Sequence, residues 1–180
     1  MDFYKLNWKD LYYDSLTLGK EIKSRKLEID RIVSIARGGL VVARILSDYL
    51  KLPISNIVIS SYKDMRQIKN PQVLEFSSSM YKNESILLVD EVSDTGTTFV
   101  RAKSFLEHFP LEKIYTCAPY IKPKTEFIPD FWLKKIDGWI IFPYDLVETY
   151  EAFVSKFGKE KAKKKLVEVG FSEKELEFLE

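Results

Sequence analysis

Residues 86–99 restrict the possible folds of this chain more than any other stretch. Residues 86–89 (Ile-Leu-Leu-Val) are wholly apolar, as in a short strand buried on both faces of a parallel sheet. Asp90 and Glu91 follow at once, and the small, hydroxyl-rich turn 94–98 then leads into helical spacing from Phe99. A strand, a glycine turn and a helix start bring together free N–H groups and the positive end of a helix dipole. This block therefore predicts an anion site.

The acids beside this turn indicate more than a phosphate. Carboxylates repel a phosphate, so Asp90 and Glu91 need a cation or neutral hydroxyl groups as partners, and a ribose phosphate supplies the hydroxyls. An acidic loop with a threonine cap is the plainer alternative for the turn by itself. The whole block resembles the phosphoribosyl-pyrophosphate (PRPP) motif of the type I phosphoribosyltransferase family. The resemblance implies a 5′-phosphate site at Asp94, Thr95, Gly96, Thr97 and Thr98.

A second unit of strand, glycine turn and helix comes earlier in the chain. Residues 31–36 have the composition of a core strand, and an apolar helical pattern follows over residues 40–50. Ala-Arg-Gly-Gly-Leu between them resembles the Ser-Arg-Gly-Gly-Leu of bacterial xanthine-guanine enzymes. That resemblance implies that Arg37, Gly38 and Gly39 hold the pyrophosphate group of PRPP.

The remaining segments fit the same alternation of helices and strands. Helical spacing predicts an amphipathic helix over residues 8–25, and strands are expected at 54–60 and 113–121. The polar residues 61–72 predict a mobile loop or an exposed hairpin, with a return strand at 73–76. Its start resembles the flexible lid that closes over PRPP in purine enzymes, which implies that role for Ser61 and Tyr62.

An aromatic segment at residues 139–145 is expected to contribute mostly to the core. It also resembles the Trp-Ile-x-x-Pro-Trp-Asp purine-binding segment of the xanthine-guanine enzymes. On that resemblance Trp139 stacks on a purine, backbone groups of Ile140 meet the C2 edge of the base, and Lys122 donates to a 6-oxo group. Those enzymes carry an acid where this chain has Ile141, so hypoxanthine and guanine rank above xanthine as substrates.

Composition sets the class of protein. A chain of 180 residues with net charge +1 fits one domain and does not favour nucleic-acid binding. Cys117 is the single cysteine, which excludes an internal disulfide and a cysteine-rich metal site. No apolar run reaches membrane-spanning length, so a cytoplasmic protein without a membrane partner is expected. We predict an α/β fold with a mainly parallel sheet flanked by helices, in a domain over residues 1–146 that includes a small purine-binding hood. A helical extension would cover residues 147–180.

The resemblance implies an enzyme of purine salvage that moves ribose 5-phosphate from PRPP to a purine base. It also implies Mg²⁺ as cofactor and a homo-oligomer, a dimer or a tetramer. Asp94 would assist proton movement at the purine, and the candidate metal ligands are Asp90, Glu91 and Asp145. The alternatives are a non-catalytic PRPP-sensing regulator of the same fold and a phosphoribosyltransferase for adenine or orotate. Lys122, a donor, opposes adenine, whose 6-amino group is also a donor.

Overall fold

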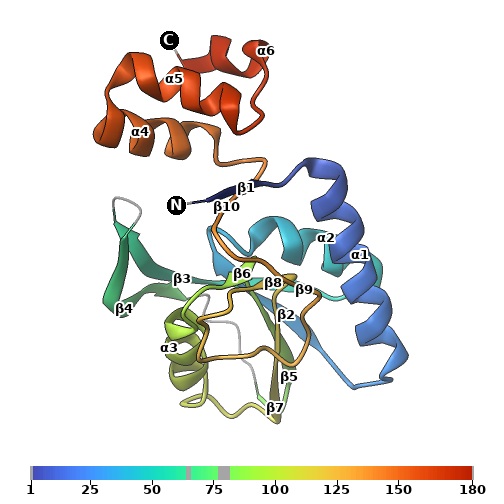
Figure 1. Cartoon of the computed structure of the whole chain (residues 1–180). Coiled ribbons are helices and arrows are strands. Elements are labelled where there is room, and N and C mark those ends of the chain that lie inside the picture. The colour runs from blue at the N-terminus through green and yellow to red at the C-terminus, as the bar shows by residue number, and fades with distance from the viewer. Residues whose placement is uncertain (1, 64–65, 77–81, 180) are drawn as a thin grey trace. The chain divides into compact units, whose positions relative to one another are not determined.

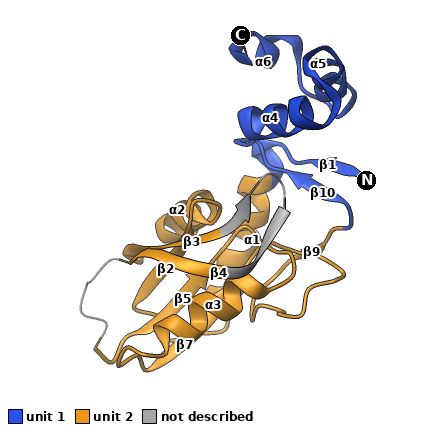
Figure 2. Ribbon diagram, turned by 90° about the vertical axis from the view of Figure 1, so that its left-hand side faces the viewer, with its two compact units in different colours: residues 1–10, 137–180 blue, residues 11–136 orange. Residues whose placement is uncertain are grey.

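The structure is a computed structural model that describes residues 2–63, 66–76 and 82–179, with the backbone alone for residues 61–63 and 66–70. It forms two compact units, coloured separately in Figure 2. One unit consists of residues 11–136, and the other combines residues 1–10 with residues 137–180. Each unit is described by itself.

The larger unit is built on a five-stranded sheet whose strands are parallel except at one edge. This arrangement, visible in Figure 1, confirms the predicted α/β fold with a mainly parallel sheet. The chain moves outward in one direction from β2 to β3 and in the other from β5 to β7, so the order of strands reverses between β2 and β5. The strand order is β4 (Arg66–Phe76), β3 (Ile54–Lys63), β2 (Arg31–Ala36), β5 (Ser85–Val89) and β7 (Lys113–Cys117).

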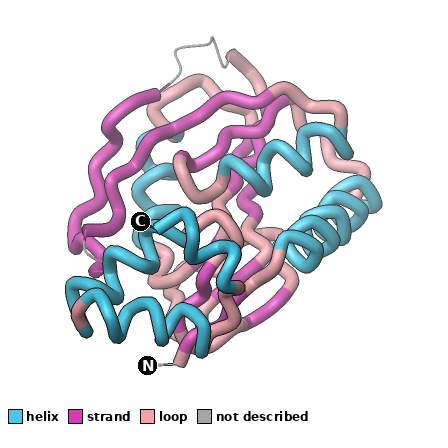
Figure 3. The backbone as a smooth tube through the Cα atoms, turned by 90° about the horizontal axis from the view of Figure 1, so that it is seen from above, coloured by secondary structure: helices cyan, strands magenta, loops and turns pink. Residues whose placement is uncertain are grey.

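Three helices flank this sheet: one precedes β2, one connects β2 to β3, and one lies between β5 and β7 along the chain. Figure 3 colours helices and strands separately. The three helices are α1 (Trp8–Ser24), α2 (Leu40–Leu50) and α3 (Thr97–Leu106), close to the predicted ranges. All five residues of β5 are buried, as a strand covered on both faces requires. Side chains from the central strands and α3 form one continuous core, which includes Val33, Ile35, Ile57, Ile86, Leu88, Phe99, Ala102 and Leu106.

A mobile loop and an exposed hairpin were the two alternatives predicted for the polar segment after residue 60, and the structure shows a hairpin. β3 continues to Lys63, and β4 returns antiparallel to it, with Tyr62 paired to Gln67 and Lys63 to Arg66. Pairing satisfies backbone groups that a loop would leave to water, so the two strands extend beyond the apolar residues that predicted them.

The strand predicted over residues 113–121 is two strands. β7 ends at Cys117, and β8 (Tyr120–Ile121) joins a separate three-stranded parallel sheet with β6 (Val92–Ser93) and β9 (Lys134–Lys135). Pro119 separates β7 from β8 because it has no N–H group to donate to a ladder. Its carbonyl instead accepts from the N–H groups of Leu133 and Lys134 at 3.1 and 3.0 Å.

The smaller unit pairs the two ends of the chain. β1 (Phe3–Lys5) lies parallel to β10 (Trp139–Ile141), and the helical tail then begins. Residues 137–146 thus share a compact unit with the tail, which has a hydrophobic core of its own. The tail consists of α4 (Leu146–Phe157), α5 (Lys159–Glu168), α6 (Glu173–Leu176) and a 3₁₀ turn at Glu177–Leu179. Its core contains Ile141, Phe153, Ala162, Leu166, Phe171 and Leu179.

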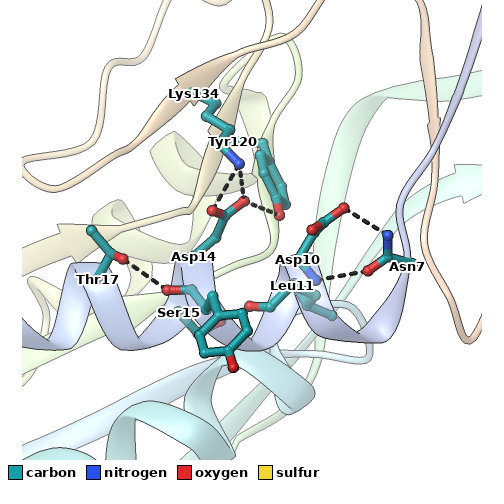
Figure 4. Close-up of polar contacts among 9 residues, drawn as sticks. Asn7, Asp10, Leu11, Asp14, Ser15, Thr17, Tyr120 and Lys134 are labelled. Atoms are coloured by element: carbon teal, nitrogen blue, oxygen red, sulfur yellow. Dashed lines mark hydrogen bonds and ion pairs between the residues drawn. The ribbon is translucent and has the colours of Figure 1, made fainter.

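A partly buried polar cluster connects α1 to the three-stranded sheet (Figure 4). The Asp14 carboxylate accepts from the Tyr120 hydroxyl at 2.8 Å, and its two oxygens accept from Lys134 Nζ at 2.8 and 2.7 Å. Tyr120 is fully buried, and its hydroxyl donates to the Asp14 carboxylate, as a buried tyrosine hydroxyl needs a partner. A hydrogen bond to a charged acceptor contributes about 1.5–3 kcal/mol to stability. The cluster therefore fixes the position of β8.

We expect Tyr120→Phe to lower the free energy of unfolding by about 1.5–3 kcal/mol, because Asp14 loses one of its donors while the ring still fills its site. Urea unfolding followed by circular dichroism measures the change. Tyr12→Phe is the matched control, since Tyr12 is half exposed on the same helix and should change stability by less than about 0.5 kcal/mol. Equal unfolding curves for the two variants would contradict the role given to Asp14.

Candidate functional site

The predicted anion-binding segments come together at the carboxyl ends of β2 and β5. These strands are neighbours, with Ser34 opposite Val89, so residues 37–39 and the acids after Val89 leave the sheet side by side. The Asp90 N–H donates to the Cys117 carbonyl at 3.0 Å, which ties the start of the acidic segment to the end of β7. In open parallel sheets, ligands bind at the carboxyl edge where the strand order reverses.

The glycine loop touches the acids directly. A Cβ atom built on Gly38 would overlap both carboxylate oxygens of Glu91, so that carboxylate lies against the Gly38 backbone. A Cβ on Gly39 would overlap the Val89 carbonyl oxygen and come within 2.9 Å of the Ile35 carbonyl oxygen. The peptide bond between Ala36 and Arg37 is cis. Glycine at position 38 therefore leaves room for a side chain, and glycine at position 39 leaves room for neighbouring backbone.

The two glycines predict different mutant behaviour. In Gly38→Ala the new methyl group meets the end of a flexible side chain, so the protein should fold while the Glu91 carboxylate is displaced. In Gly39→Ala it meets backbone carbonyls that cannot give way, so the free energy of unfolding should fall by about 1–3 kcal/mol. Thermal unfolding and PRPP titration calorimetry separate the two effects. A destabilised Gly38→Ala variant, or a Gly39→Ala variant as stable as wild type, would contradict this assignment.

Asp90 is the buried member of the acid pair. Its side chain is nearly inaccessible, and Asp90 Oδ1 accepts from the Glu91 N–H at 3.0 Å. Burial raises the pKa of Asp90 from 3.8 to about 6, and hydrogen bonds with Glu91 offset part of that rise. The fold keeps this carboxylate poorly solvated. A bound cation or hydroxyl donors would therefore favour its ionised form.

This shift predicts how stability depends on pH. The folded protein holds the Asp90 proton more tightly than the unfolded chain does. The contribution of protonated Asp90 to folding stability is therefore fully present below pH 3.8 and is lost as the pH rises through about 6. Asp90→Asn keeps an acceptor for the Glu91 N–H but has no charge to bury. Its advantage in unfolding free energy over wild type should therefore grow between pH 4 and pH 7, by about 1–3 kcal/mol.

Urea unfolding at several pH values measures that difference. Asp48→Asn is the control, because Asp48 is an exposed carboxylate on α2 in the same unit, and its difference from wild type should stay nearly constant. A constant difference for Asp90→Asn as well would show that burial does not perturb Asp90.

The turn before α3 has the form expected of an anion-binding turn. Gly96 caps the helix with a φ angle of +89°, and its carbonyl accepts from the Val100 N–H at 3.0 Å. The Thr95 and Thr97 hydroxyls lie 3.0 Å apart. A Cβ on Gly96 would overlap Phe127, so this turn requires glycine both for its conformation and for space.

The segment that carries Lys122 is held against this turn by backbone hydrogen bonds. The Lys122 N–H donates to the Ser93 carbonyl at 3.0 Å, and the Glu126 N–H donates to the Thr95 carbonyl at 3.0 Å. The Ser93 hydroxyl donates to the Phe127 carbonyl at 2.7 Å. Lys122 is itself buried, with 7% of its surface exposed. The structure thus brings the predicted base-binding lysine and the predicted phosphate turn together.

Lys124 was missed by the sequence analysis. Its ammonium group lies 3.0 Å from Asp94 Oδ1, at the first residue of the turn. The signal available in the sequence was its position two residues after Lys122, but the pairing with Asp94 depends on how residues 122–127 pack on the turn.

The remaining predicted site residues belong to β3 and to the smaller unit. The side chains of Ser61 and Tyr62 are outside the described residues, and their backbone belongs to β3. Trp139 and Ile140 belong to the smaller unit, where Trp139 packs against the tail core and Ile140 is buried. Asp145, in the same unit, precedes α4 and accepts from the Phe142 N–H at 3.2 Å through Oδ2. The roles given to these residues stay predictions.

Two kinds of feature are absent from the described residues. Across 2–63, 66–76 and 82–179, no three or more His, Cys, Asp or Glu side chains are grouped so that they could hold a metal ion by themselves. In that same part of the chain, no helix is both long and apolar enough to span a bilayer.

Comparison with known proteins identifies relatives of the chain. Residues 16–150 match the family model of the phosphoribosyl transferase domain. A xanthine-guanine phosphoribosyltransferase of Idiomarina loihiensis is 32% identical over 147 residues, which cover 78% of this chain and 86% of that protein. A protein with the same name from Nitratidesulfovibrio vulgaris is 30% identical over 145 residues, 79% of this chain and 84% of that protein.

Among solved structures, the purine phosphoribosyltransferase of Pyrococcus horikoshii matches with a TM-score of 0.69 and 27% identity. The match covers 80% of this chain and 95% of the other.

Proposed function

This chain belongs to the phosphoribosyl transferase family, and from that membership we propose that it is a purine phosphoribosyltransferase. In the proposed reaction, ribose 5-phosphate passes from PRPP to a 6-oxopurine and pyrophosphate is released. The names of the two relatives support a purine as the acceptor, since both are xanthine-guanine phosphoribosyltransferases.

One observation supports the proposal most strongly. Lys122, a buried cation, is tied through its own N–H to Ser93, immediately before the turn proposed to take the 5′-phosphate. A base held at Lys122 and a ribose phosphate held at residues 94–98 would therefore lie on adjoining segments. Transfer between two substrates needs this kind of fixed proximity, which can supply much of the rate gain.

The acids and the glycine loop are assigned to the rest of PRPP. Asp90 and Glu91 would accept from the ribose hydroxyls, and the loop at Arg37, Gly38 and Gly39 would hold the pyrophosphate. The two adjacent carboxylates also fit Mg²⁺, which proteins hold through one or two carboxylates together with substrate phosphates. When bound there, the ion would neutralise charge on the leaving pyrophosphate. Burial of Asp90 supports this assignment, because a cation would favour its ionised form.

Asp94 is proposed to lie near N7 of the purine and to assist proton movement as the base is ribosylated. The departing pyrophosphate leaves positive charge on the ribose, so a carboxylate and the donors of the glycine loop would stabilise opposite charges in the transition state. The hairpin β3–β4 is proposed to close over PRPP through Ser61 and Tyr62 and to exclude water from the reactive sugar.

Lys122 is proposed to select the base. A lysine only donates, so it would pair with a 6-oxo group and reject a 6-amino group. Hypoxanthine and guanine rank above xanthine, because Ile141 stands where the xanthine-guanine enzymes carry an acid. Stacking by Trp139, backbone contacts of Ile140, metal contact by Asp145, homo-oligomer formation and a cytoplasmic location are parts of the same proposal.

Base selection gives the sharpest test. Lys122→Met should lose activity with hypoxanthine and guanine disproportionately, by up to about 10⁴-fold, because a site built to hydrogen-bond one group is left without its donor. Trp139→Ala should weaken binding of every purine about equally, because all purines can stack. Steady-state kinetics with hypoxanthine, guanine, xanthine and adenine compare the two variants with wild type.

Two results of that experiment would overturn the assignment. Wild-type protein that uses adenine as well as guanine would show that Lys122 does not face the base. A Lys122→Met variant with an unchanged ratio of guanine to adenine activity would show the same.

A further inference from the structure

We propose that Lys124 is a positioning residue of the phosphate turn, and that its ammonium group neutralises Asp94 so that the turn can accept a phosphate dianion. This inference rests on the proposed function, because it concerns the segment 94–98 to which the 5′-phosphate is assigned.

The turn has an electrostatic conflict at its first residue. The glycine at residue 96, the threonine hydroxyls and the positive end of the α3 dipole favour an anion there. Asp94 opens the same turn with a carboxylate whose side chain is only 13% exposed, so water screens its charge poorly. A phosphate dianion that binds beside Asp94 therefore needs a cation close to that carboxylate.

Lys124 supplies a cation at that position. Its Nζ lies 3.0 Å from Asp94 Oδ1, while its side chain is 64% exposed. Exposed ion pairs contribute little to stability, since water competes for the charge and the long side chain loses freedom. The ammonium group nevertheless lies against the carboxylate that opens the turn, where it offsets the charge that would repel a phosphate.

The backbone explains why Lys124 reaches Asp94. The Thr125 N–H donates to the Lys122 carbonyl at 3.1 Å and closes a tight turn around residue 124. The Glu126 N–H then donates to the Thr95 carbonyl, and the Phe127 ring stacks on Phe99 with ring centres 5.2 Å apart. Residue 124 is thus fixed between two anchored points, one of them inside the phosphate turn.

This arrangement couples the two substrates. Lys122 and Lys124 flank Pro123 on one short segment, which would place one cation at the base and the other beside the phosphate turn. Proline restricts the backbone between them, so the separation of the two Cα atoms has little freedom.

Ribose 5-phosphate is the probe for this role, and titration calorimetry is the measurement. Lys124→Met should raise the dissociation constant about three- to fivefold, the size of one partly screened charge interaction. Lys124→Arg should bind nearly as wild type does, because it keeps the charge. Lys135→Met is the matched control, since Lys135 is exposed on β9, and it should leave binding unchanged.

A double-mutant cycle with Asp94→Asn separates this role from direct contact with the phosphate. If Lys124 acts by neutralising Asp94, adding Lys124→Met to Asp94→Asn should change the dissociation constant less than twofold. An equal loss of affinity in both backgrounds would mean that Lys124 contacts the phosphate itself and would overturn the proposal.

Binding of ribose 5-phosphate and PRPP by wild-type protein distinguishes failure of the role given to Lys124 from failure of the proposed function. Wild-type protein that binds ribose 5-phosphate, together with a Lys124→Met variant that binds it equally well, would overturn the role of Lys124 and leave the proposed function standing. Wild-type protein that binds neither ribose 5-phosphate nor PRPP would overturn the proposed function, and this inference with it.

Discussion

The contact between Gly38 and the Glu91 carboxylate is the interaction on which the rest of the site depends. It exists because β2 and β5 are parallel neighbours, so the segments that follow them leave the sheet together. The opposite end of the same strand pair is fastened differently, where Arg31 forms a two-pronged ion pair with Glu84, at 2.7 and 3.1 Å. The Arg31–Glu84 ion pair thus joins the two strands where they begin, and the proposed ligand-binding segments follow where the strands end.

The same constraint has a cost in stability that the function explains. Asp90 is buried beside Glu91 although burial disfavours its charge, and a fold under selection for stability alone would place an amide or an apolar group there. Residues that disfavour folding in this way are concentrated at functional sites. In the same sense Asp94, a carboxylate with little exposure, opens the turn proposed to take the phosphate, and Lys124 lies 3.0 Å from it.

The sequence was sufficient for the local parts of this arrangement. Strand–glycine–helix units over 31–50 and 86–106 depend on short-range patterns, and the structure confirms them within one or two residues. The break at Pro119 was missed, although proline removes a ladder donor, because apolar residues continue on both sides of it. The Lys124–Asp94 pair could not be predicted, since residues 30 apart meet only through the packing of Phe127 on Phe99. The pairing of Trp139 with Phe3 in β1 could not be predicted either, because local spacing does not indicate pairing between segments so far apart in the sequence.

The release of pyrophosphate from PRPP tests the central claim most directly. Phosphorus magnetic resonance can follow PRPP with Mg²⁺ and wild-type protein, first without a base and then after addition of guanine or hypoxanthine. The account predicts that pyrophosphate and the matching nucleoside monophosphate appear together, and only once the 6-oxopurine is present. PRPP that binds but stays intact with these bases would contradict the account and would favour a PRPP-sensing regulator. Turnover confined to adenine or orotate would contradict the choice of base.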